Sequence, residues 1–205
     1  MSTTRSLLPL VMSAAAVLAL ACTDRMPPKA IPPAGVIDSA LPVAELLRRF
    51  RAALPDTTPV TQFTHAAPNR DALVRRFVDA LNNRDTAAFR DMMLDRREFA
   101  WLYYDEHFLS KPPYEMPPWL MWQRAVSLSD NGLATALGEF GGRALRLETV
   151  TCPDSMPKAS GALQLWERCV IRMRSPAKEL IENRFFGTIV GRDGRWKFAS
   201  YASDL

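Results

Sequence analysis

The sequence predicts one α+β domain in which helices come first and an antiparallel sheet comes last. Up to about residue 94, apolar residues recur at spacings of three and four, which indicates amphipathic helices. From residue 145 onward the apolar period is two, which is typical of strands with one buried face. Asp193-Gly194 separates two apolar runs and is the strongest hairpin signal in the chain. We place this domain at residues 39–205.

The helices are predicted from apolar stripes together with start and stop signals. Pro42 suits the first turn of a helix, Asp85 suits an N-cap, and Asn131-Gly132 suits a C-cap. The expected helices are 42–54, a helix through 73–81, 85–93, 118–130 and a separate short one at 133–140. The expected strands are 145–152, 163–173, 185–190 and 195–201.

Composition and charge narrow the class of protein. The chain has 205 residues, of which 48% are hydrophobic and 23% charged, and these values exclude a disordered, fibrous or multi-span membrane protein. Lys and Arg number 26 against 22 acidic residues, and the net charge of +4 is too small and too evenly spread to indicate a nucleic-acid partner.

The first 21 residues have the pattern of a secretory signal peptide. Arg5 precedes an apolar stretch, Leu7 to Ala21, which at 15 residues is shorter than the roughly 20 that a membrane-spanning helix needs. Ala19-Leu20-Ala21 is a small-x-small cleavage site, and Cys22 follows it directly. We therefore expect export and cleavage after Ala21.

The junction at Cys22 resembles the lipobox of bacterial lipoproteins, in which cleavage leaves an N-terminal cysteine that carries lipid. It departs from that pattern at Ala19, where Leu, Val or Ile is usual. The resemblance implies a membrane partner through lipidated Cys22 and a place in the cell envelope, facing the periplasm or the exterior. Ordinary signal-peptidase cleavage without lipidation is the alternative. Residues 22–38, with two Pro-Pro pairs, are expected to form an extended tether of about 3.1 Å per residue.

The cysteines predict a disulfide. Free thiols tend to pair in an exported chain, and lipidation of Cys22 would leave Cys152 and Cys169 as an even pair. A tight hairpin turning near residues 155–160 would place Cys152 opposite residue 162, so the bond requires a folded-back loop or another strand register. Two buried thiols that never meet are the alternative.

An aromatic, Pro-rich stretch between Phe99 and Trp122 is the best candidate for a site. It holds eight of the chain's 19 aromatic residues, and such rings stack on ligands at pocket mouths. Asp105 or Glu115 would serve there as a base if buried, with Tyr103 or Tyr104 as its phenol partner. Simple packing of a long loop onto the core is the alternative. The ligand-binding candidates are Trp101, Tyr103, Tyr104, Tyr114, Trp119 and Trp122.

Residues 77–94, FVDALNNRDTAAFRDMML, resemble the opening of the nuclear-transport-factor-like superfamily, which includes ketosteroid isomerases and polyketide cyclases. The matching residues are Ala80-Leu81, Asn82-Asn83-Arg84 and Asp85, and the final hairpin GTIVGRDGRWKFASYASD is also similar. The resemblance implies a curved, cone-like sheet wrapped around helices and enclosing an apolar pocket. No catalytic motif of the superfamily aligns, so it implies no activity.

The sequence gives little support for a metal site or for a serine nucleophile. His65 and His107 are 42 residues apart and match no metal-ligand spacing, and His107, beside Asp105 and Glu106, is expected in a solvated loop. Ser155-Met156-Pro157-Lys158 and Ser129-Asp130-Asn131 imitate motifs of serine acyl-transfer enzymes in reversed order, and we interpret both as coincidence.

The sequence therefore favours a membrane-tethered envelope lipoprotein that binds a small apolar ligand or a protein partner, without catalysis, cofactor or metal. A periplasmic isomerase, hydratase or cyclase that uses the carboxylates and phenols named above is the competing hypothesis. A structural assembly factor with an exposed apolar patch is the third.

Overall fold

The computed structural model describes residues 41–154 and 156–201, which belong to the unit Ala40–Leu205. The predicted signal peptide, the lipidation site at Cys22, the tether at 22–38 and Ser155 lie outside the described residues.

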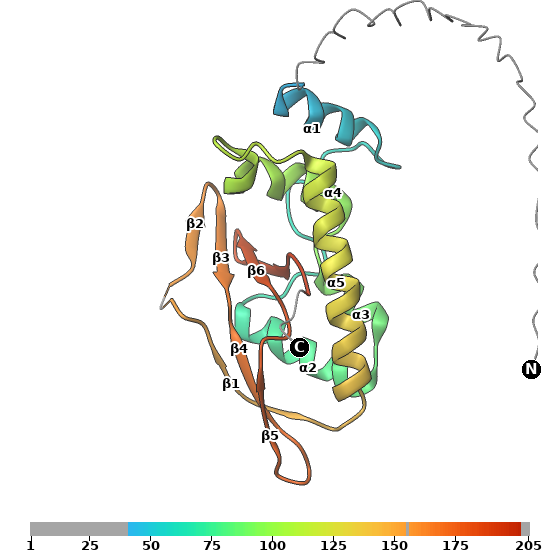
Figure 1. The fold of residues 1–205 in the computed structure, drawn as a ribbon, viewed down its shortest axis with the longest axis vertical. Coiled ribbons are helices and arrows are strands. Elements are labelled where there is room, and N and C mark those ends of the chain that lie inside the picture. Colours follow the sequence, from blue (N-terminus) through green and yellow to red (C-terminus); the bar gives the residue numbers. More distant parts are fainter. Residues whose placement is uncertain (1–40, 155, 202–205) are drawn as a thin grey trace, which may run out of the picture. The chain divides into compact units, whose positions relative to one another are not determined.

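The helices all precede the strands, as the sequence predicts. Five are α-helical, and three short pieces (η1 to η3) form π- or 3₁₀-helices between α4 and α5. In Figure 1, α5 lies on the opposite side of the folded unit from β1 and β3. The bounds are α1 Val43–Ala52, α2 Arg70–Asn83, α3 Thr86–Met92, α4 Arg96–Glu98, η1 Phe99–Tyr103, η2 Tyr104–Glu106, η3 Phe108–Ser110 and α5 Pro118–Phe140.

The strands form two antiparallel sheets, which confirms the α+β class. The expected single curved, cone-like sheet is not present in the described residues. One sheet has the order β1-β4-β5 and the other β2-β3-β6-β7, and neither closes or curls. The bounds are β1 Arg146–Thr151, β2 Lys158–Ser160, β3 Leu163–Glu167, β4 Val170–Arg174, β5 Leu180–Asn183, β6 Thr188–Arg192 and β7 Arg195–Phe198.

Side-chain caps fix the starts of two helices. The side chain of Asn69 accepts a hydrogen bond from the backbone N–H of Ala72 at the start of α2. Asp85 accepts hydrogen bonds from the N–H groups of Ala87 and Ala88, which confirms it as the N-cap of α3. Arg84 between the two helices takes the left-handed conformation that ends α2.

The predicted break at Asn131-Gly132 is wrong, because α5 continues through both residues to Phe140. A glycine inside a helix costs about 1 kcal/mol relative to alanine, which packing can offset. Gly132 lies on the buried side of α5 with Ser129 and Ala136. The hydroxyl of Ser129 accepts the N–H of Tyr201 and donates to the carbonyl of Ala125. The small residues thus let α5 approach the C-terminal end closely, and Ser129 has a structural role.

The four-stranded sheet is covered on both faces. Alternate residues point to opposite faces, so Ile189 and Phe198 face one core while Val190 and Lys197 face the other. The first core centres on Phe77 of α2, whose ring lies 5.2–6.1 Å from five aromatic rings. The second core contains Phe50 of α1 and Phe99 of η1, with ring centroids 5.7 Å apart.

The predicted disulfide between Cys152 and Cys169 is present, with an S–S distance of 2.07 Å. The turn between β2 and β3 lies at Gly161-Ala162, because Ser160 pairs with Leu163. This is later than the turn expected at 155–160. The register also shifts by two residues between the β2–β3 pair and the β1–β4 pair, so Thr151 pairs with Val170 and the two cysteines meet at the next position. The bond therefore joins the two places where this hairpin passes from one sheet to the other.

Glycine is required at this turn. Gly161 has φ of 60°, a left-handed conformation, and a Cβ there would lie 1.6 Å from a carboxylate oxygen of Glu106. The neighbouring Ser160 hydroxyl donates to the carbonyl of Glu106 at 2.6 Å. The tip of the hairpin is thus fixed against η2.

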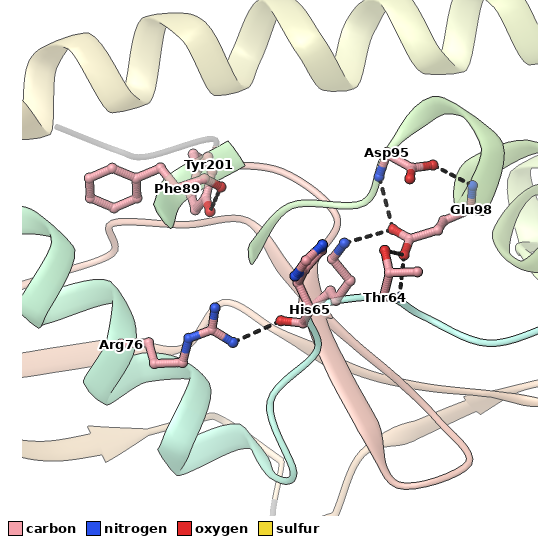
Figure 2. A network of polar contacts seen from close by, with 8 residues as sticks. Thr64, His65, Arg76, Phe89, Asp95, Glu98 and Tyr201 are labelled. Carbon is pink, nitrogen blue, oxygen red and sulfur yellow. Dashed lines mark hydrogen bonds and ion pairs between the residues drawn. The ribbon is translucent and has the colours of Figure 1, made fainter. Parts of the chain in front are cut away.

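A buried ion pair joins the helices to the sheet (Figure 2). Glu98 and Lys197 are 0% and 2% exposed, and Nζ of Lys197 lies 2.7 Å from Oε2 of Glu98. The same carboxylate accepts hydrogen bonds from the N–H of Asp95 and from the N–H and hydroxyl of Thr64. Asp95 in turn accepts from the N–H of Glu98, which completes a capping box at the start of α4. One carboxylate thereby connects β7, α4 and the loop before α2.

Replacing Lys197 by Met should lower the free energy of unfolding by about 3–5 kcal/mol, because it leaves a carboxylate buried without its cation. Urea unfolding of the purified protein measures this. The matched control Lys111→Met changes an exposed lysine and should shift stability by less than about 0.5 kcal/mol. Equal stability of the two variants would show that the pair does not hold the fold together.

Candidate functional site

A small pocket of about 180 Å³ lies between η1, the loop after it, α5 and the ends of β6 and β7. We call it the η1–α5 pocket. Its walls are mostly apolar, with Tyr103, His107 and Arg124 as the larger polar side chains. The lining residues are Leu94, Phe99, Tyr103, His107, Leu109, Met121, Trp122, Arg124, Ala125, Leu128, Thr188, Ala199 and Ser200.

The helical wall of the pocket follows from a change of helix type. The capping box starts α4, and the chain then widens into the π-helix η1, in which the N–H of Tyr104 bonds to the carbonyl of Phe99 five residues earlier. π-Helical turns are rare and occur frequently at functional sites. The rings of Phe99 and Tyr103 lie 5.9 Å apart, and Phe99 lies 5.3 Å from Trp122 of α5. Three aromatic rings from two elements thus form one wall.

His107 and Tyr103, the two buried polar rings of the pocket, are neutral near pH 7. Burial lowers the pKa of His107 to about 4, and the nearby charge of Glu167 opposes this only in part. The Nδ1 atom of His107 accepts the N–H of Leu109 at 3.2 Å, so the ring proton is on Nε2. Burial, followed by the charge of Glu167, raises the pKa of Tyr103 well above its ordinary value. The pocket therefore offers neutral hydrogen-bonding groups rather than a base.

Tyr103 is the polar residue best placed to meet a ligand. It is only 6% exposed and lines the pocket. Across residues 41–154 and 156–201, its hydroxyl makes no hydrogen bond. The hydroxyl is not among the fully buried polar atoms that lack a partner in the described residues, so it keeps some contact with solvent. A polar ligand atom in the pocket could take the place of water as its hydrogen-bond partner.

The structure brings two of the six predicted ligand-binding aromatics, Tyr103 and Trp122, to the pocket. Tyr104 is buried, and its hydroxyl donates to the carbonyl of Met116 at 2.6 Å, which is a structural role. Trp101 is half-buried beneath the guanidinium of Arg51, 4.1 Å from the ring centroid.

The other two predicted aromatics lie on the surface. Tyr114 is 62% exposed and Trp119 is 54% exposed, and neither lines the η1–α5 pocket. The loop after η3 carries the first, and the opening turn of α5 carries the second.

The expectation of a buried carboxylate base is not met at either candidate. The side chain of Asp105 is 57% exposed and pairs with Arg51 at 2.8 Å. Glu115 is exposed and lies in a loop at φ of 43°. An exposed carboxylate, whether in water or beside a guanidinium, lacks the apolar surroundings that a base in a dry site requires, so neither residue fits that role.

The prediction that His107 lies in a solvated loop is also wrong. Its ring packs against Tyr103 and Phe108 with centroid distances of 5.0 and 4.5 Å, and it is 6% exposed. The neighbouring acidic residues suggested a surface, whereas the apolar side chains on either side of them carry the histidine inward. His65 is exposed.

Several pocket residues were not predicted from the sequence. Met121, Ala125 and Leu128 follow the helical spacing of four and three along α5, a signal that is present in the sequence. Thr188, Ala199 and Ser200 join the site only through the fold, and no local pattern marks them.

Metal-binding clusters and membrane-spanning helices are both absent from the described part of the chain. No group of three or more His, Cys, Asp or Glu residues in it is placed to hold a metal ion. In the same residues, no helix combines the length and the apolar character needed to span a membrane.

No protein-family model, curated protein or solved structure matches this chain. The resemblance of residues 77–94 to the nuclear-transport-factor-like superfamily therefore stays a prediction.

The stability of the protein should depend on pH through His107. The unfolded state takes up a proton near pH 6.5 and the folded state only near pH 4, so stability falls as the pH drops between these values and is retained above 6.5. We expect urea unfolding at pH 7 and pH 4.5 to show a loss larger by roughly 2 kcal/mol in the natural protein than in His107→Phe. Equal losses in both proteins would contradict the buried neutral imidazole.

Proposed function

We propose that the mature protein is a membrane-tethered lipoprotein of the cell envelope whose domain binds a small, mostly apolar ligand in the η1–α5 pocket, without catalysis. The observation that carries this proposal is the unpartnered hydroxyl of Tyr103 in an apolar pocket of about 180 Å³. A cavity of about 150 Å³ is large enough to bind benzene. The expected ligand therefore has one ring or a short branched chain, together with one polar atom.

The chemistry of the pocket supports binding rather than turnover. Its two buried polar rings are a neutral imidazole and a neutral phenol, and the candidate carboxylates Asp105 and Glu115 lie in exposed positions. Arg124 at the pocket is exposed and supplies positive charge to a ligand's polar end. Such groups orient a ligand, whereas proton abstraction needs a base with a pKa near the working pH.

The tether and the location are supported by the cysteines. The disulfide between Cys152 and Cys169 is a bond typical of oxidising compartments outside the cytoplasm. It leaves Cys22 as the odd cysteine of the chain, and Cys22 follows the expected cleavage site directly. Lipidation accounts for that cysteine and for the Pro-rich residues that follow it.

The cone-like fold belongs to this proposal as well. Asp85 caps α3 directly after α2, which agrees with the opening pattern of the nuclear-transport-factor-like superfamily. The pocket lies between helices and the four-stranded sheet, where that superfamily encloses its ligands. The two sheets of the described residues do not close. If the chain belongs to that superfamily, its sheet is therefore flatter than the cone-like sheet that the superfamily implies.

Filling the pocket should abolish binding of a small aromatic probe. Ala125 on α5 lines the pocket, and Ala125→Leu should weaken binding of phenol by roughly tenfold or more, because the added side chain occupies the ligand's space. Ala134→Leu is the matched control, since Ala134 is exposed on the same helix. NMR titration of the purified protein measures both affinities.

The same titration separates the roles of ring and hydroxyl. Tyr103→Phe should weaken binding of phenol by roughly tenfold and leave binding of toluene unchanged, because only phenol has a hydrogen bond to lose. If phenol binds equally well to all of these variants, the pocket is not the ligand site.

Mass spectrometry of the intact protein, purified from the membranes of its native host, tests the tether. The mass should equal that of a chain beginning at Cys22, plus acyl groups, minus the two hydrogens of one disulfide. A chain that retains residues 1–21, or one that begins at an unmodified Cys22, would contradict the proposed anchor.

A further inference from the structure

Exposed apolar side chains are concentrated in one short stretch of the chain. Among the described residues, eight large apolar side chains are exposed, and four of them lie between positions 108 and 120. We call these four the aromatic end: Phe108 (46% exposed), Tyr114 (62%), Trp119 (54%) and Leu120 (41%). Exposed large apolar side chains that are grouped together on a domain mark a place of contact, whereas single ones are ordinary.

The backbone holds these side chains outward in a fixed arrangement. The N–H of Met116 donates to the carbonyl of Leu109 at 2.8 Å and closes the loop, and the hydroxyl of Tyr104 donates to the carbonyl of Met116. At the tip, the N–H of Tyr114 donates to the carbonyl of Lys111. The rings of Phe108 and Tyr114 then meet edge to face at 5.8 Å. The hydrogen bonds of the loop therefore keep these rings exposed.

The chain enters the domain at the same end. The described chain begins at Leu41, which is 40% exposed, and α1 starts two residues later. α1 packs against α5, whose first turn carries Trp119 and Leu120. Figure 1 shows α1, the loop before α5 and the start of α5 together at this end of the folded unit. The 18 residues between Cys22 and Leu41 are therefore joined to the domain at the end where α1 begins.

The composition of this end suits the interface of a lipid bilayer. Trp and Tyr are enriched at the boundary between lipid headgroups and acyl chains, where a ring with a polar tip fits both environments. Two exposed cations, Lys111 and Arg124, accompany one exposed carboxylate, Glu115, so the charge does not oppose an anionic membrane surface.

We infer that the aromatic end inserts into the interface of the membrane that carries the lipidated Cys22. This contact gives the domain a second attachment and one orientation on the bilayer. The inference rests on the tether of the proposed function, because a short tether keeps the domain near the membrane and raises the effective concentration of a weak contact.

The test measures vesicle binding without the lipid anchor. Cys22→Ser removes the acylated cysteine, and the protein used is one whose mass shows that residues 1–21 have been removed, so that any binding comes from the mature chain without lipid. This protein should sediment with vesicles of phosphatidylethanolamine and phosphatidylglycerol. Adding Tyr114→Ser and Trp119→Ser should lower its partition coefficient by roughly tenfold or more, because two rings lose their burial in the bilayer.

The chain supplies a matched control. Met156→Ser with Leu180→Ser removes two large apolar side chains that are 74% and 48% exposed in other parts of the domain, and it should leave vesicle binding unchanged. Thermal unfolding midpoints of both double variants should equal that of the parent, since all four positions are exposed.

Equal vesicle binding of the two double variants, or no binding by the parent, would overturn the inference. Self-association of the parent that disappears in Tyr114→Ser with Trp119→Ser, without vesicle binding, would also overturn it and would assign the surface to a second copy of the chain. Vesicle binding by the domain combined with an unmodified Cys22 in the native protein would refute the proposed tether alone. Acylated Cys22 without vesicle binding would refute the membrane contact alone.

Discussion

The buried carboxylate of Glu98 is the point through which the helical and the sheet halves of this domain are connected. A carboxylate without exposure is stable only when its charge and its lone pairs are satisfied. Lys197 of β7 supplies the charge, and Asp95 and Thr64 supply hydrogen-bond donors. Any movement of β7 relative to α4 would separate these groups, so the pair fixes the position of one element against the other.

The Glu98–Lys197 ion pair also positions residues of the η1–α5 pocket. Glu98 directly precedes Phe99, which begins the π-helix, and four residues later the same turn presents Tyr103 to the pocket. On the other side, Lys197 is followed by Phe198 and then by Ala199, which lines the pocket. Both walls of the pocket thus begin within two residues of the two partners of the ion pair. The ion pair therefore helps to set where the two walls stand relative to each other.

Local patterns predicted helix starts well, whereas the expected strand at 163–173 is divided into β3 and β4, which belong to different sheets. Asp85 is an N-cap because its side chain reaches N–H groups two and three residues away, and that is visible in the sequence. The cysteine pair was predicted by counting, although its register depends on a turn at Gly161 and on a two-residue shift between the two sheets rather than on the earlier turn that was expected. These features need little knowledge of distant parts of the chain.

The failures concern contacts between distant residues. Glu98 and Lys197 are 99 positions apart, and nothing local marks either of them as buried. Asn131-Gly132 is a pattern typical of the end of a helix, but α5 continues through it because Gly132 is buried in a closely packed contact. Among the site residues, Tyr103 and Trp122 were predicted, whereas His107 was assigned to solvent because its neighbours are acidic. Burial decides its role, and burial is a property of the whole fold.

The central claim is that the η1–α5 pocket is a binding site, and a high-resolution crystal structure of the protein purified from its native membranes tests it most directly. We expect electron density for a small molecule in the pocket, with a polar atom within hydrogen-bond distance of the Tyr103 hydroxyl. A pocket closed by rotation of Trp122, with the Tyr103 hydroxyl bonded to another group of the protein, would contradict the claim.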